Sequence, residues 1–253
     1  MNTLLLRLTG PMQSWGTQSR FAMRDTQLEP SKSAVIGLLC AAEGTERDNF
    51  TRISTLVNLK MGVRVDCEGT KEYDYQTVRD ILSADGTDNT RSSVGKRYYL
   101  ADASFLVGLE SRNLDLLKDL QSVLANPRWF VFLGRKSFVP SKPVLLWEDL
   151  HHGLYEGKEL LDALRDYPWL GRAWQKRPVQ LRYVIEHHVG EPTPANQPIT
   201  QINDQPLSFD IQDRRYIPRY VRTIIEPPSQ KIFAHLKEQG ETKFHEGVDK
   251  EAA

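Results

Sequence analysis

The order of hydrophobic patterns in the first part of the chain is the feature that most limits its fold. Apolar and polar residues alternate, or short apolar runs occur, where the chain is predicted to form four strands, over 3–9, 61–65, 103–109 and 129–133. Helical spacing follows the first strand, over 31–44, and the third strand, over 114–124. The predicted order is β-α-β-β-α-β, the ferredoxin-like (RRM-like) arrangement of an α+β fold with its helices on one sheet face.

The helix boundaries carry their own signals. Ser31 follows Pro30 at the cap position of the first helix, and Gly44 is a plausible C-terminal stop. Asn126-Pro127 ends the second helix, because the residue before proline avoids helical geometry. A further short helix is predicted over 47–56.

Residues 67–100 interrupt the pattern between the second and third strands. They hold few aliphatic residues, several glycines and a polar centre, so they are predicted to form a long excursion with a mobile tip. Their aromatic residues are interleaved with cations, a composition suited to single-stranded RNA, whose bases stack on rings while cations hold the backbone. The residues concerned are Tyr73, Tyr75, Arg79, Arg91, Lys96, Arg97, Tyr98 and Tyr99.

The pattern weakens after residue 143. The remaining chain is predicted to hold an acidic stretch over 144–170, a helix over 158–167, a strand over 181–187, a proline-punctuated loop over 192–206 and a basic strand or pair of strands over 210–225. We therefore divide the chain into a ferredoxin-like domain over 1–143, a smaller β-rich part over 144–225 and a polar tail over 226–253 that is predicted to fray.

Composition narrows the function. The 33 Lys and Arg residues balance the 33 Asp and Glu residues, so any nucleic-acid site must be local. Cys40 and Cys67 are the only cysteines, and the apolar run at the N-terminus is too short for a signal peptide or membrane span, which favours the cytoplasm. The histidine pairs at 151–152 and 187–188 lack partners at ligand spacing, so no metal is expected.

Three loops place polar donors beside glycine or proline. Residues 10–16 combine glycines with an aromatic ring, although composition alone favours Trp15 as a core anchor. Residues 30–33 start the first helix with two hydroxyls and a lysine, which suits a phosphate but also describes an ordinary N-cap. The loop over 133–143 is basic, although a charge run is usually a solvated face.

Four motifs, taken together, indicate a more specific function for these loops. They are Gly-Pro-Met-Gln-Ser-Trp-Gly at 10–16, Pro-Ser-Lys-Ser-Ala-Val-Ile-Gly-Leu-Leu at 30–39, Ala-Asp-Ala-Ser-Phe at 101–105 and Phe-Leu-Gly-Arg-Lys-Ser at 132–137. The combination resembles the CasD family, subunits of the type I-E CRISPR Cascade complex within the superfamily of repeat-associated RNA-binding proteins. The resemblance covers about residues 3–225 and does not include the tail.

The resemblance implies a noncatalytic subunit of an RNA-guided antiviral surveillance complex. Such a subunit caps the foot of the complex, binds the 5′ handle of the CRISPR RNA (crRNA), and contacts the backbone and large subunits. It meets target DNA only through the complex, and needs no cofactor and no membrane. The excursion would be a thumb-like β-hairpin inserted between nucleotides.

Carried onto this sequence, the resemblance and the cations of the excursion, whose acids offset its bases overall, assign RNA-binding roles to sixteen residues. They are Gln13, Ser14, Trp15, Gly16, Arg24, Ser31, Lys32, Ser33, Arg79, Arg91, Lys96, Arg97, Gly134, Arg135, Lys136 and Ser137. The chain departs from the family at Phe138, where a Cys is common, and in its polar thumb tip. Both departures concern details of the handle fit.

Two other functions remain open. The first is a metal-independent endoribonuclease that processes CRISPR repeat RNA, with general acid and base groups drawn from Tyr73, Tyr75, Lys96 and the histidines at 187–188. No spacing in the sequence links these residues into one site. The second is a structural adaptor that touches only protein partners.

Overall fold

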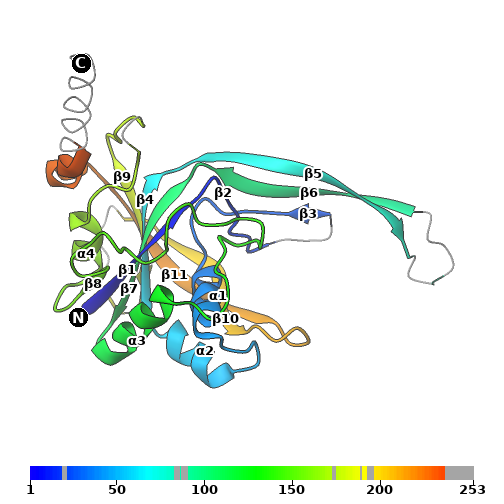
Figure 1. Ribbon diagram of the computed structural model, residues 1–253, viewed down its shortest axis with the longest axis horizontal. Helices are drawn as coiled ribbons and strands as arrows, with labels where there is room; N and C mark the ends of the chain where they lie inside the picture. Colours follow the sequence, from blue (N-terminus) through cyan, green and yellow to red (C-terminus); the bar gives the residue numbers. More distant parts are fainter. Residues whose placement is uncertain are drawn as a thin grey trace, which may run out of the picture.

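The computed structural model describes residues 1–18, 22–82, 86, 91–172, 175–188, 190–192 and 197–236. Within these ranges the chain has the α+β fold expected from the sequence, built on a seven-stranded antiparallel sheet and a smaller mixed sheet. Figure 1 shows a body of strands and helices from which one long hairpin projects. No helix in the described ranges is long and apolar enough to span a membrane.

A seven-stranded antiparallel sheet forms the centre of the body. Its spatial order is β10-β11-β9-β4-β7-β1-β8. These strands are β1 (Asn2–Thr9), β4 (Lys60–Cys67), β7 (Ser104–Ser111), β8 (Leu154–Tyr155), β9 (Leu181–His187), β10 (Ile199–Ser208) and β11 (Arg215–Glu226). The strands predicted over 3–9, 61–65, 103–109 and 181–187 are confirmed.

Helices cover both faces of this sheet. The larger core packs α1 (Lys32–Glu43), α2 (Phe50–Val57) and α3 (Leu114–Ala125) against one face. The smaller core packs α4 (Leu160–Asp166) and the 3₁₀ turn η1 (Gln230–Phe233) against the other. Along β1, alternate side chains enter the two cores, so this strand is buried on both faces rather than on one as predicted.

The ends of α1 follow the sequence signals. Ser31 is the N-cap and its hydroxyl accepts a hydrogen bond from Ala34 N, while Gly44 ends the helix with a left-handed φ of 74°. Asn113 caps α3 in the same way, and Asn126 ends it. The short helix predicted over 47–56 begins later, at Phe50, because Asn49 supplies its cap.

The strand predicted over 129–133 is wrong. These residues are irregular and form no strand, although Leu133 is buried in the larger core and Val131 packs against it, while Phe130 is 86% exposed. The amides of Arg128 and Trp129 donate to the carbonyls of Ala42 and Ala41 at the end of α1, at 2.8 and 3.1 Å. The edge beside β1 is instead occupied by β8 and by a single bridge from Leu145 to Leu6.

The excursion folds into a long antiparallel hairpin of β5 (Thr70–Ile81) and β6 (Arg91–Ala101). At its base β2 (Met12–Gln13) pairs antiparallel with β6, and farther out β3 (Met23–Arg24) pairs parallel with it. Figure 1 shows both short strands on the same side of the hairpin. Of the polar tip, 83–85 and 87–90 lie outside the described residues.

The C-terminal strands extend the central sheet. The segment predicted as a loop over 192–206 contains most of β10, and that prediction is wrong for its second half. Pro206 is accommodated because β10 is an edge strand and its pairing with β11 shifts register on both sides of that residue. The basic run is one strand, β11. The prediction that the tail over 226–253 frays is wrong for its first part, because η1 buries Ile232 and Phe233 in the smaller core; residues from 237 onward lie outside the described residues.

Candidate nucleic-acid interface

A groove of about 440 Å³ lies where the three candidate loops meet the base of the hairpin. Its walls come from the loop after β1, from β3, from the first turn of α1, from β6, from the loop after α3 and from the β10–β11 connection. The lining residues are Ser14, Gly16, Arg24, Asp25, Ser31, Ser33, Ala34, Arg97, Gly134, Arg135, Phe209 and Tyr216. Eight of the sixteen predicted residues therefore line one groove.

Three arginines give the groove its charge. Arg24 and Arg97 are register partners on β3 and β6, so they extend from adjacent positions, and Arg135 reaches the groove from the loop after α3. Arg135 Nη2 donates to the carbonyl of Tyr98 at 2.7 Å, which fixes this guanidinium at the foot of β6. Burial, and then the neighbouring Arg97, lower the pKa of Arg135. An anion in the groove would relieve this repulsion.

The loops are joined by backbone contacts that depend on one glycine. Ser14 N donates to the carbonyl of Leu133 at 3.0 Å, and Ser14 Oγ bonds to the carbonyl of Tyr98 at 3.2 Å. Gly134 has a φ of 94°, and a Cβ at this position would lie 1.8 Å from Ser14 O. Only glycine permits this close approach, so Gly134 shapes the groove through its backbone.

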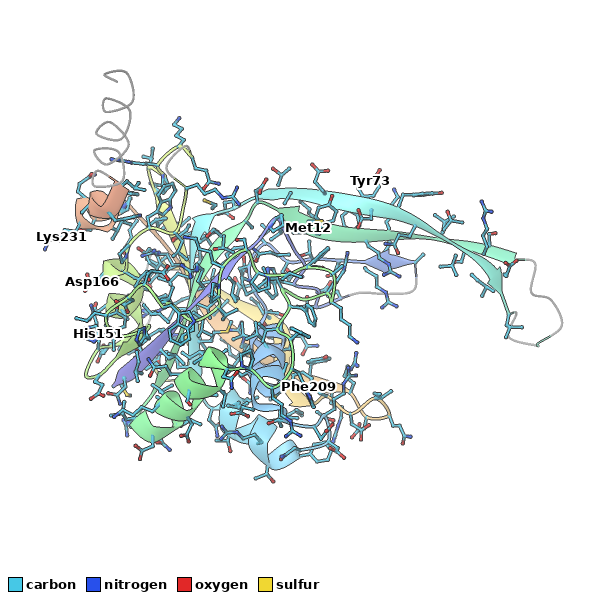
Figure 2. The ribbon with its side chains drawn as sticks, viewed as in Figure 1. Met12, Tyr73, His151, Asp166, Phe209 and Lys231 are labelled. Carbon is cyan, nitrogen blue, oxygen red and sulfur yellow. The ribbon has the colours of Figure 1, made fainter. Side chains whose placement is uncertain are left out.

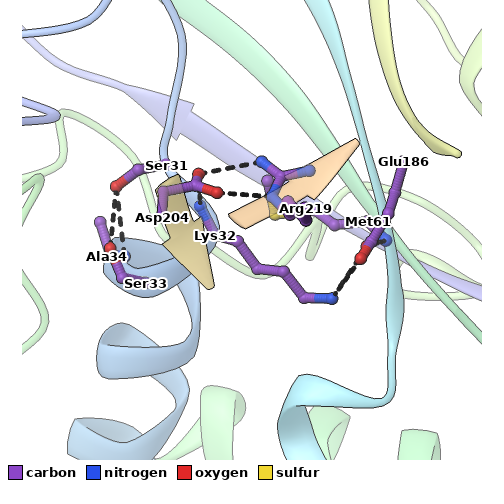
Figure 3. A network of polar contacts seen from close by, with 8 residues as sticks. All are labelled: Ser31, Lys32, Ser33, Ala34, Met61, Glu186, Asp204 and Arg219. Atoms are coloured by element: carbon purple, nitrogen blue, oxygen red, sulfur yellow. Dashed lines mark hydrogen bonds and ion pairs between the residues drawn. The ribbon is translucent and has the colours of Figure 1, made fainter. Parts of the chain in front are cut away.

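The first turn of α1 presents hydroxyls and not its lysine. Ser31 Oγ and Ser33 Oγ lie 3.3 Å apart at the groove, whereas Lys32 is 1% exposed. Lys32 Nζ contacts both oxygens of Glu186, at 2.7 and 2.9 Å (Figure 3). Burial lowers the pKa of Lys32, and the attraction of Glu186 opposes that shift. In this structure Lys32 cannot present its charge to a ligand in the groove.

A second buried pair completes this network. Asp204 Oδ2 accepts from Lys32 N at 2.7 Å and from Arg219 Nη2 at 2.9 Å, so a carboxylate caps the helix from a distant strand. Glu186 likewise accepts from Met61 N at 2.9 Å. Figure 3 shows α1, β9, β10 and β11 tied together through these side chains. The network positions the first turn of α1 against the sheet.

Two residues of the loop after β1 point into the protein. Trp15 is 1% exposed and belongs to the larger core, so it is a core anchor, one of the two roles considered from the sequence. Its ring offers no stacking face to a base in this structure. Gln13 is fully buried, and its Nε2 donates to the carbonyls of Leu8 and Ala103 at 3.2 and 2.7 Å. Both residues hold the loop in place, and Gly16 is the one that reaches the groove beside Ser14.

The other predicted residues lie outside the groove. Lys96 is adjacent to Arg97 but points to the opposite face of the hairpin, where its Nζ lies 5.0 Å from the ring centroid of Tyr73. Figure 2 shows Tyr73 on the projecting part of the hairpin. Arg79 is exposed on β5, and the backbone of Arg91 begins β6, while its side chain lies outside the described residues. Lys136 lines a neighbouring cavity, and Ser137 is exposed.

Four groove residues were missed from the sequence: Ala34, Asp25, Phe209 and Tyr216. Tyr216 stood inside the basic run over 210–225, so its aromatic ring among arginines was a usable signal. Phe209 and Asp25 had none, because the β10–β11 connection and the segment before α1 meet only in the folded chain. Among the described residues, no group of three or more His, Cys, Asp or Glu side chains is arranged to hold a metal ion.

Comparisons with known proteins agree with the motifs. The family model described as CRISPR-associated protein (Cas_Cas5) matches residues 3–222. The chain therefore belongs to the Cas5 family of CRISPR-associated proteins, which confirms the resemblance inferred from the loops.

Individual relatives extend this result. The CRISPR system Cascade subunit CasD of Escherichia coli (strain K12) is 32% identical over 180 residues, or 66% of this chain and 78% of the relative. A crystal structure of a Cas protein is 39% identical with a TM-score of 0.68, covering 90% of this chain and 99% of the other. A chain from a CRISPR RNA-guided surveillance complex is 30% identical with a TM-score of 0.70, covering 93% and 99%.

Proposed function

We propose that this protein is a noncatalytic subunit of a Cascade-type surveillance complex and that its groove holds the 5′ handle of the crRNA. One observation carries the proposal: Arg24, Arg97 and Arg135 converge from three separate segments on one groove. Guanidinium groups bind phosphate oxygens in a bidentate manner, and the hydroxyls of Ser31 and Ser33 add neutral donors. The family membership and the CasD relative of E. coli support this choice of ligand.

The architecture supports the finer parts of the proposal. Strands β1, β4 and β7 lie side by side with α1 and α3 on one face, as in a ferredoxin-like domain whose fourth-strand position is taken by β8. The β5–β6 hairpin is then the thumb that separates nucleotides, and β9, β10 and β11 form the smaller β-rich part. In this proposal the protein acts in the cytoplasm and contacts the backbone and large subunits.

The groove offers positioning rather than acid–base chemistry. The endoribonuclease alternative needs a base and an acid in one site, yet Tyr73 and Lys96 meet on the hairpin while His187 is 9% exposed on β9. To test for cleavage, the purified protein is incubated with its cognate repeat RNA in EDTA. We expect no product, and a discrete fragment carrying the handle would overturn the noncatalytic assignment.

The groove itself is tested in the assembled complex. Removing one cation that neutralises a phosphate of single-stranded RNA reduces the slope of log affinity against log salt by about 0.7. We expect Arg24→Ala and Arg97→Ala each to produce such a change when RNA retention is measured across a salt series. Lys118→Ala is the matched control, because it removes a half-exposed cation from α3 that pairs with surface Glu156, outside the groove.

The adaptor alternative predicts a different result. If Arg24→Ala, Arg97→Ala and Arg135→Ala complexes retain RNA with the wild-type salt slope, the handle-binding proposal fails. The protein would then contribute only contacts to other subunits.

A further inference from the structure

A second cavity, of about 640 Å³, opens beside the arginine groove. It lies between the C-terminal half of α1, the loop over 129–136 and the β10–β11 connection. Phe209 and Tyr216 line both the groove and this cavity, so the two adjoin and share a wall. Figure 2 shows Phe209 beside α1, on the side from which the hairpin projects. We name this cavity the side pocket.

The side pocket has an aromatic wall that the fold holds open to solvent. Trp129 is 40% exposed and Phe130 86% exposed, and Phe132 completes the wall. The loop that carries them is fixed by the bonds from its backbone to the end of α1, and Leu133 N donates to the carbonyl of Phe138 at 2.8 Å. Large aromatic groups kept at the surface by backbone bonds are typical of binding sites.

The rim of the side pocket is basic. Arg47, Lys136 and Arg214 surround it, against the single acid Glu46, and all four are exposed. Aromatic faces interleaved with cations suit single-stranded RNA, whose bases stack while its phosphates are neutralised. Because the side pocket adjoins the arginine groove and shares Phe209 and Tyr216 with it, the same RNA strand is favoured over an acidic protein segment as the occupant.

We propose that the side pocket receives a nucleobase of the RNA strand as it leaves the arginine groove. The base stacks on the wall formed by Trp129 and Phe130, and Lys136 and Arg214 hold the flanking phosphates. This inference rests on the proposed function, since it requires the handle to occupy the groove. In this proposal Lys136 contacts the RNA in the side pocket, whereas Gly134 and Arg135 of the same motif line the groove.

The test places one 4-thiouridine at a time along the 5′ region of the crRNA, within the assembled complex. Irradiation and mass spectrometry then identify the cross-linked peptides. We expect at least one position to cross-link to Trp129, Phe130 or Phe132, which line the side pocket and not the groove, and other positions to cross-link near Arg97 or Arg135. Cross-links confined to the groove peptides would overturn the side-pocket inference and leave the proposed function intact. If no position cross-links to this subunit, both the side-pocket inference and the proposed handle binding are wrong.

A matched pair of variants supplies a second readout. Phe130→Ala removes an 86% exposed ring, and Leu150→Ala removes an 87% exposed side chain from outside both cavities, so neither change disturbs the core. We expect Phe130→Ala to abolish the 129–132 cross-link and to weaken RNA retention by about fivefold to hundredfold, the range for one base that no longer stacks, while Leu150→Ala does neither. If Phe130→Ala releases a protein subunit and leaves RNA retention unchanged, the pocket binds protein and the inference is wrong.

Discussion

The buried position of Lys32 predicts that its substitution acts on stability and not on RNA binding. Lys32→Met leaves Glu186 2% exposed and without its ammonium partner. Removing one member of a buried pair destabilises proteins by about 3–5 kcal/mol. Glu186 keeps the bond from Met61 N, which places the expected loss in the lower half of that range.

A double-mutant cycle isolates the pair. In Lys32→Met/Glu186→Gln the amide oxygen can still accept from Met61 N, and no unpaired charge remains buried. We therefore expect the double variant to be more stable than Lys32→Met alone, with a coupling energy of at least about 1 kcal/mol. Urea denaturation of the purified chain measures each free energy of unfolding.

The RNA readout decides the role of Lys32. At temperatures where the folded variant predominates, Lys32→Met complexes should keep the wild-type salt slope for RNA retention, whereas Arg97→Ala lowers it by about 0.7. The reasoning is refuted if Lys32→Met leaves the free energy of unfolding unchanged and lowers the salt slope. That result would mean that the Lys32 side chain breaks its ion pair with Glu186 and binds a phosphate of the RNA.

Three further predictions concern other parts of the fold. Gly134→Ala should destabilise the protein by about 1 kcal/mol or more and weaken RNA retention, because the φ of Gly134 is positive and an added Cβ would strike Ser14 O. Gly157→Ala is the control, since a Cβ added there meets nothing within 4 Å. It should preserve RNA retention in the same assay. Arg64→Met should lower the free energy of unfolding, measured by urea denaturation, by about 3–5 kcal/mol, because this fully buried guanidinium pairs with a carboxylate and three carbonyls near α4. The slope of RNA affinity against salt should stay unchanged. Burial raises the pKa of the Cys40 thiol to about 12, so its alkylation in the folded protein should stay slow from pH 7 to 9 and accelerate on unfolding, as mass spectrometry of iodoacetamide adducts would show.

The sequence predicts best where local pattern and burial agree. The alternation at 3–9 and the capping residues Ser31 and Gly44 specify β1 and the ends of α1 because these signals are local in the sequence, and Asp204 only adds to the cap from a distant strand. The run over 129–133 has the composition of a buried strand, yet backbone bonds to α1 hold its aromatic residues at the surface. Composition cannot distinguish these two states, since the deciding contacts come from another element.

The sequence also does not show which cations of the candidate site face the groove, because contacts with distant residues decide this. Lys32 stood in the most phosphate-like motif of the chain, but Glu186, 154 residues away, neutralises it inside the fold. Arg97 stood in an excursion whose acids offset its bases, but alternation along β6 turns it into the groove and turns Lys96 away. A neutral chain thus obtains a basic groove by pairing some cations internally and aligning others. The strength of RNA binding should follow the few aligned arginines and not the number of cations in the motifs.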